Sequence, residues 1–188
     1  MSYIRLAADY LLYRMRAFKL HGVHSPFMFE LYHHVLHHTG YFPAYDRVEE
    51  LRDKLLEDER QLQVTDFGAG SRSINYKTRK VKDIARTSAK PAKYGQLLFR
   101  LVNHFQPETI LELGTSLGLS TSYLAEARRK GHIYTFEGCP NIARVARENF
   151  KYLNLKNIQL IEGNLDETLQ HQLSQIQRLD FAYLDGNH

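Results

Sequence analysis

Hydrophobic and polar residues follow two different periods along this chain, and these periods predict where strands and helices lie. Four short apolar runs, each ending in or followed by a glycine or an acidic residue, have the composition of buried strands in a parallel sheet. They span Thr109–Leu113, His132–Glu137, Ile158–Glu162 and Phe181–Leu184. Helical spacing of apolar residues separates them. The alternation predicts an α/β fold with a partial Rossmann-like sheet of four core strands.

The region before these strands is predicted to be mainly helical. Amphipathic patterns predict helices over Tyr3–Lys19, 26–38, Arg47–Arg60 and Ala92–Phe105, with Ser25 as the N-cap of the second. We therefore expect an N-terminal helical extension over residues 1–90 and a sheet domain over residues 91–188. The first helix is expected to pack on the protein's own domain or on a second copy, and the latter would give a homodimer through the N-terminal helices.

A strand pattern at Gln61–Asp66 and a glycine-rich stretch at Asp66–Ser71 precede a strongly basic segment. We interpret the glycine-rich stretch as a β-turn or flap over a ligand. The basic segment contains the single acid Asp83 and the cations Arg72, Lys77, Arg79, Lys80, Lys82, Arg86, Lys90 and Lys93. Such a run is typical of a solvated loop, and our second interpretation is that it holds an anionic small substrate.

Nucleic acid is a disfavoured partner of the basic segment. Only Tyr76 and Tyr94 could stack on bases within or beside it, and proteins that bind single strands combine basic grooves with several aromatic platforms. A nucleic-acid-binding or RNA-methylating module that uses residues 72–93 therefore remains an alternative, and steep salt dependence of binding would support it.

Composition limits the classes of protein that fit. The chain has 188 residues, of which 43% are hydrophobic, which suits one substantial core. No run is long enough to span a membrane and no signal peptide is visible, so we expect a cytoplasmic protein with no membrane partner. The net charge of +4 permits an anionic substrate. The single cysteine, Cys139, excludes an internal disulfide, and we interpret it as a cap or packing residue.

Histidines in the second predicted helix form two pairs at helical i, i+4 spacing. His33 with His37, and His34 with His38, could each chelate zinc. No third ligand is evident near them in the sequence. We favour structural or solvated histidines over a metal site.

The most informative stretch follows the first of the four strands. Gly114 and Gly118 bracket a turn between the strand and the next helix, and such a turn brings backbone N–H groups against a ligand at the carboxyl end of the strand. A dinucleotide fingerprint would need glycines in place of Ser116 and Leu119, so an NAD-dependent oxidoreductase is a second, disfavoured alternative. The following strand ends in Glu137, whose carboxylate could accept both hydroxyls of a ribose.

The pattern Glu112-x-Gly114-x-x-x-Gly118, followed by Glu137, resembles the first motif of class I S-adenosylmethionine-dependent methyltransferases. From about Lys93 onward, the stretches Lys-Tyr-Gly-Gln-Leu-Leu-Phe-Arg-Leu and Ile-Leu-Glu-Leu-Gly-Thr-Ser-Leu-Gly-Leu-Ser-Thr are similar to O-methyltransferases that act on catechols and on coenzyme A esters of phenolic acids. Residues 1–90 match that group poorly. The leader His-Gly-Val-His-Ser-Pro-Phe is also similar to one found in bacterial methyltransferases.

The resemblance implies an enzyme that uses S-adenosylmethionine to methylate an oxygen of a small-molecule acceptor. It implies that the cofactor is bound by Glu112, Gly114, Thr115, Ser116, Gly118, Ser120, Glu137, Gly138, Asn164 and Asp185. Asp185 or His188 would handle the acceptor proton, and Asp185 would also be the magnesium or calcium ligand in a metal-dependent member. A domain of this type has seven strands, so we expect the sequence to be a truncated form with feeble turnover by itself.

Overall fold

The computed structural model describes residues 3–16, 25–66 and 75–185. The chain divides into two compact units, residues 1–39 and residues 40–188. The first unit contains α1 (Tyr3–Arg16), the short helix α2 (Pro26–Leu31) and the π-helical turn η2 (Tyr32–Leu36). The hydroxyl of Ser25 accepts a hydrogen bond from the Met28 amide over 3.4 Å, which confirms the predicted N-cap.

The histidines of the first unit contact aromatic rings. The ring of His33 lies 4.4 Å from that of Phe29, and the ring of His37 stacks 4.0 Å from that of Tyr32. Across the described ranges, no three His, Cys, Asp or Glu side chains are grouped so that they could hold a metal ion. These contacts agree with the structural interpretation of the histidine pairs.

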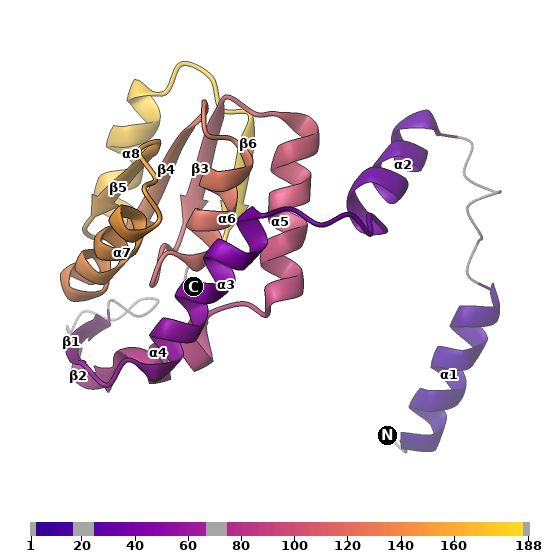
Figure 1. The fold of residues 1–188 in the computed structure, drawn as a ribbon, viewed down its shortest axis with the longest axis horizontal. Coiled ribbons are helices and arrows are strands. Elements are labelled where there is room, and N and C mark those ends of the chain that lie inside the picture. Colours follow the sequence, from indigo (N-terminus) through magenta and orange to yellow (C-terminus); the bar gives the residue numbers. More distant parts are fainter. Residues whose placement is uncertain (1–2, 17–24, 67–74, 186–188) are drawn as a thin grey trace. The chain divides into compact units, whose positions relative to one another are not determined.

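The second unit is built on a parallel four-stranded sheet in the order β5-β4-β3-β6 (Figure 1). The strands are β3 (Thr109–Leu113), β4 (His132–Glu137), β5 (Ile158–Glu162) and β6 (Phe181–Leu184), which are the predicted ranges. The chain runs outward from β3 to β4 and β5, then returns to pair β6 with the other side of β3. Open sheets bind ligands at such a change of direction, beyond the carboxyl ends of the strands.

Helices connect and cover these strands. They are α3 (Ala44–Glu57), α4 (Val81–Ser88), α5 (Ala92–Phe105), α6 (Leu119–Ala127), α7 (Pro140–Tyr152) and α8 (Leu165–Gln175). Helix α6 ends at Ala127, before the basic residues Arg128–Lys130. On α5, Phe99 is buried, whereas Phe105 at the end of the helix is 44% exposed.

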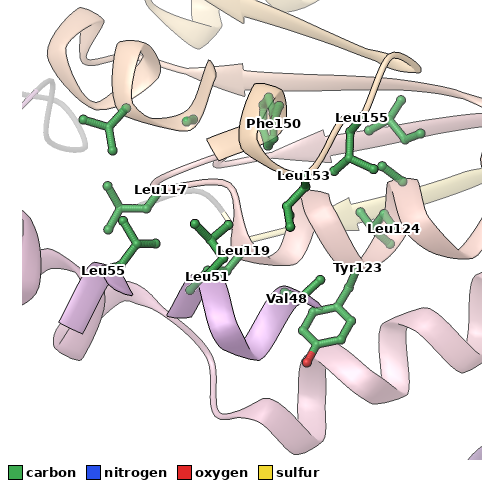
Figure 2. Packing of buried hydrophobic residues seen from close by; sticks show 14 of the residues in the cluster. Val48, Leu51, Leu55, Leu117, Leu119, Tyr123, Leu124, Phe150, Leu153 and Leu155 are labelled. Carbon is green, nitrogen blue, oxygen red and sulfur yellow. The ribbon is translucent and has the colours of Figure 1, made fainter. Parts of the chain in front are cut away.

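Helix α3 belongs to the second unit and packs against α6. Figure 2 shows Val48, Leu51 and Leu55 of α3 pointing toward Leu117, Leu119 and Tyr123, and all six side chains are buried. The boundary between compact units therefore falls after Thr39, whereas the sequence analysis places a domain boundary after residue 90. The apolar stripe of α3 explains the difference, since it covers the helix that follows the glycine turn.

The basic segment is mostly folded, so its interpretation as a solvated loop is wrong. β1 (Gln61–Asp66) pairs antiparallel with β2 (Asn75–Lys80) in a separate two-stranded sheet, and α4 follows directly. Helix α4 forms because Val81, Ile84 and Ala85 lie on one face and are buried. The connection at 67–74, which includes most of the predicted flap Asp66–Ser71, lies outside the described residues.

Several cations of this segment have acidic partners. Lys80 and Lys82 both pair with Glu59, the first over 2.8 Å, and Arg86 lies 3.7 Å from Asp83. These ion pairs reduce the positive charge that the segment could offer to a nucleic acid.

Candidate functional site

The turn after β3 has a backbone conformation with several positive φ angles. Gly114, Ser116 and Gly118 have positive φ angles of 98°, 49° and 81°. A Cβ atom on Gly118 would lie 2.5 Å from the ring of Phe150, so both conformation and space require glycine there. The amides of Gly114 and Thr115 donate to the carbonyl oxygen of Phe136 over 3.1 and 2.9 Å, which ties the turn to the end of β4.

Glu137 lies directly beside this turn. Its Oε2 accepts a hydrogen bond from the Ser116 amide over 2.8 Å, and its Oε1 accepts one from the Cys139 amide over 3.0 Å. Burial raises the pKa of Glu137, and the two amide hydrogen bonds oppose that shift. Each carboxylate oxygen keeps a lone pair for a further donor. Two backbone amides therefore orient the carboxylate of Glu137, the residue predicted to hold a ribose, beside the turn.

Glu112 lies beneath the turn and is fully buried. Its Oε2 accepts hydrogen bonds from the hydroxyls of Thr121 and Thr135, the latter over 2.7 Å, and Thr135 contacts the Thr115 hydroxyl over 2.6 Å. Its Oε1 has no hydrogen-bond partner among the described residues. Burial raises the pKa of Glu112 to about 7, while the hydroxyl donors act in the opposite direction.

A cavity of about 940 Å³ opens above these groups. Eight of the predicted cofactor residues line it, namely Gly114, Thr115, Ser116, Ser120, Glu137, Gly138, Asn164 and Asp185. Glu112 and Gly118 are not among the lining residues, because the first is buried under the turn and the second packs against Phe150. His188 lies outside the described residues. The structure thus gathers one site from four loops at the carboxyl end of the sheet.

Asp185 follows β6 at the rim of the cavity. Its amide donates to the Leu113 carbonyl oxygen over 2.9 Å, which places it beside the start of the glycine turn. Its Oδ1 lies 2.9 Å from the ammonium of Lys90, and its Oδ2 accepts from the Tyr183 hydroxyl over 3.0 Å. Burial and the neighbouring carboxylate raise the pKa of Tyr183, so the phenol stays protonated.

Two further predicted residues have structural partners. The side chain of Asn164 caps α8 by accepting a hydrogen bond from the Asp166 amide over 3.1 Å. Asn164 also lines the cavity. Cys139 is buried at the start of α7, and its Sγ accepts from the Thr65 amide over 3.3 Å. This contact brings β1 to the cavity and confirms the packing role of Cys139.

Sequence reasoning named Arg79 and Lys90 only within the basic segment that could hold an anionic substrate, and it missed Arg52. Arg52 of α3, Arg79 of β2 and Lys90 after α4 all line the cavity. They come from segments that precede the glycine turn by 24 or more residues, so only the tertiary fold brings them to the site. The alternation of β1 and β2 is the one local signal that bears on Arg79, since it lies opposite the buried Leu62.

Comparison with known proteins identifies the sheet region. A family model described as "Methyltransferase domain" matches residues 111–188. This part of the chain is therefore similar to methyltransferase domains. The match begins at Leu111 and includes the glycine turn, Glu137, Asn164 and Asp185, whereas the cations of the cavity wall lie outside it.

The chain is also similar to curated O-methyltransferases over part of its length. The chain is 36% identical over 88 residues to a Transmembrane O-methyltransferase of Propithecus coquereli. The matched stretch covers 43% of this chain and 32% of that protein. It is 30% identical over 95 residues to Catechol O-methyltransferase B of Danio rerio, which covers 48% of this chain and 36% of that protein. The chain therefore spans about a third of the length of these relatives.

Solved structures share the fold of the domain. A Podospora anserina methyltransferase with bound SAH has a TM-score of 0.57 and 22% identity over 81% of this chain and 53% of its own. A putative O-methyltransferase of Klebsiella pneumoniae has a TM-score of 0.54 and 25% identity over 79% and 55%. The Rossmann-like methyltransferase fold predicted from the sequence is confirmed. No helix in the described part of the chain is both long and apolar enough to cross a bilayer.

Proposed function

We propose that this chain is the S-adenosylmethionine-binding part of an O-methyltransferase that acts on a small molecule. The observation that carries the proposal is the hydrogen bond of 2.8 Å between the Ser116 amide and Glu137 at the mouth of the cavity. It puts a carboxylate suited to ribose hydroxyls next to bare main chain suited to the rest of the cofactor.

The cavity fits a cofactor of this shape. Gly114, Thr115 and Ser116 would lie along its amino-acid part, Glu137 would accept from its ribose, and Gly138 and Asn164 would lie beside its adenine. The volume of about 940 Å³ is near the upper end of the range for ligand pockets, which supports room for an acceptor beside the cofactor. S-adenosylmethionine supplies an electrophilic methyl group on a sulfonium.

The protein's own part in such a transfer is mainly positioning. Alignment of an acceptor oxygen with the methyl carbon can lower a barrier by about 7 to 11 kcal/mol. Asp185 contacts the Leu113 carbonyl, Lys90 and Tyr183 at the end of β6, which supports the proposal that it would hold an acceptor hydroxyl and take its proton. His188 stays a second candidate for that proton.

The described residues do not fit a divalent cation at Asp185. Both carboxylate oxygens already have protein partners, one of them the Lys90 ammonium. Hard divalent cations are held by several oxygen ligands, and no group of three His, Cys, Asp or Glu side chains occurs in the described ranges.

Isothermal titration calorimetry of the wild-type chain tests the proposal. We expect S-adenosylhomocysteine to bind with one-to-one stoichiometry and NAD to give no heat of binding. Binding of NAD without binding of S-adenosylhomocysteine would instead support an oxidoreductase and overturn the proposal.

A further inference from the structure

Among the described residues that line the cavity, one cation has no acidic side chain as an ion-pair partner. Arg52 pairs with Glu49 over 2.8 Å, and Lys90 pairs with Asp185 over 2.9 Å. Arg79 also lines the cavity, but no described acidic side chain forms an ion pair with it. A partly buried, unbalanced guanidinium favours an anionic group of a ligand.

The register of the β1–β2 hairpin explains why Arg79 faces the cavity. Arg79 lies directly opposite Leu62, and directly opposed residues of an antiparallel pair have their side chains on the same face. Leu62 is 4% exposed, and Val64, two residues further along β1, lines the cavity. The neighbouring Lys80 points to the other face, where it pairs with Glu59 over 2.8 Å.

The guanidinium is also held in one orientation. Its Nη2 donates to the Thr87 hydroxyl over 2.7 Å and lies 3.5 Å from the Asp83 carbonyl oxygen. The Thr87 hydroxyl in turn donates to the Asp83 carbonyl oxygen over 2.8 Å. Both of these contacts to described residues use Nη2, and Nε or Nη1 would donate a charge-assisted hydrogen bond to a carboxylate oxygen.

We propose that Arg79 binds a carboxylate group in the cavity and that Thr87 positions it. This inference rests on the proposed function. Two sources share the chemistry, since S-adenosylmethionine carries a carboxylate on its amino-acid part and an acidic acceptor would carry one of its own.

The first arm of the test compares two cofactor products. Calorimetry measures binding of S-adenosylhomocysteine, which has the carboxylate, and of 5′-methylthioadenosine, which lacks the amino-acid part, to wild type, Arg79→Gln and Arg79→Lys. A charge-assisted hydrogen bond contributes enough for a loss of about 10- to 100-fold in affinity on removal. If the cofactor is the source, Arg79→Gln loses S-adenosylhomocysteine affinity by this amount, keeps 5′-methylthioadenosine affinity, and Arg79→Lys recovers part of the loss.

The second arm compares an acid with its neutral analogue on protein saturated with S-adenosylhomocysteine. If the acceptor is the source, wild type binds 4-hydroxybenzoate more tightly than 4-hydroxybenzamide, and Arg79→Gln removes that preference. Thr87→Val removes the hydroxyl that accepts from Nη2. In the arm where Arg79→Gln lowers the affinity, Thr87→Val should lower it by a smaller factor.

Arg86→Gln is the matched control, because Arg86 is an exposed arginine of the adjacent helix and does not line the cavity. The proposal is overturned if Arg79→Gln behaves as wild type in both arms, or if it weakens both cofactor products equally. Failure of the wild-type chain to bind either cofactor product would instead refute the proposed function itself, without any variant.

Discussion

The amide of Ser116 and the carboxylate of Glu137 are joined by a hydrogen bond of 2.8 Å across 21 residues of sequence. The parallel strands β3 and β4 end at the same edge of the sheet, where Glu137 is the last residue of β4 and Ser116 lies in the turn after β3. The pairing orients the carboxylate before any ligand arrives and leaves its outer lone pairs toward the cavity.

Glu137→Ala is expected to lower the affinity for S-adenosylhomocysteine by about 10- to 100-fold, because a charged acceptor of two ribose hydroxyls is lost. The affinity of Glu137→Gln for S-adenosylhomocysteine should lie between those of Glu137→Ala and wild type, since one acceptor oxygen remains. Calorimetry measures both. Glu162→Ala is the control, because Glu162 ends the neighbouring strand β5 but does not line the cavity. Equal affinities in wild type and Glu137→Ala would remove the basis for the cofactor assignment.

Glu112 is expected to make the chain less stable as the pH rises. Its pKa is about 7 in the folded state and near 4.5 in the unfolded state, so between these values the folded state binds more protons. The free energy of unfolding should therefore fall between about pH 4.5 and pH 7, by about 3 kcal/mol in total for this group. The raised pKa of Glu137 adds a change of the same sign.

Urea denaturation at pH 5 and pH 8 measures this dependence. Glu112→Gln cannot ionise, so its free energy of unfolding should change less between pH 5 and pH 8 than that of wild type. This comparison does not depend on how stable the variant is at either pH. The same pH dependence in Glu112→Gln and wild type would show that the carboxyl ionises without cost beneath the turn.

Gly95→Ala is expected to destabilise the chain, although alanine normally stabilises a helix interior by about 1 kcal/mol relative to glycine. A Cβ atom on Gly95 would lie 2.4 Å from the ring of Tyr123, which is fully buried and donates to Glu49 over 2.5 Å. Overpacking of this kind costs about 1 to 3 kcal/mol. Thermal or urea denaturation measures the change.

A Tyr123→Ala background is the control for that collision. The penalty of Gly95→Ala should shrink or reverse there, because the ring is gone, and a double-mutant cycle gives the coupling. An unchanged penalty in that background would assign the effect to something other than the ring.

Gly118→Ala is expected to cost more stability than Gly114→Ala. Both residues have positive φ angles, which alanine adopts at a cost of about 1 to 2 kcal/mol. Only Gly118 adds a collision, since its Cβ would lie 2.5 Å from Phe150. Denaturation curves of the two variants compare them directly, and equal losses would contradict the role of Phe150.

Local patterns were enough to predict the sheet and the turn. The strands from Thr109 to Leu184 are short, apolar and bounded by glycine or acidic residues, so their period is readable without tertiary information. Glu137 could be found because the end of a strand next to a glycine turn has a fixed position in a parallel sheet.

The β1–β2 hairpin, the cations of the cavity wall and the position of Glu112 depend on contacts between residues that are distant in the sequence. The charges of Lys77, Arg79 and Lys80 hide the alternation of β2, which becomes a strand only by pairing with β1. Arg52 reaches the cavity from a segment with no local sign of ligand binding, and Lys90 is one of eight cations in a basic run that does not indicate which of them lines the cavity. Glu112 carries the motif yet lies under the turn, because its carboxylate is the acceptor for Thr121 and Thr135.

The buried threonine hydroxyls have a consequence for the kinetics of binding. Because Thr115, Thr135 and Thr121 connect the glycine turn to Glu112 inside the protein, the turn has its final shape in the free chain. A preorganised loop loses little conformational freedom when a ligand enters. Association should therefore follow a single phase whose rate rises linearly with nucleoside concentration, without a slow loop-closing step at this turn.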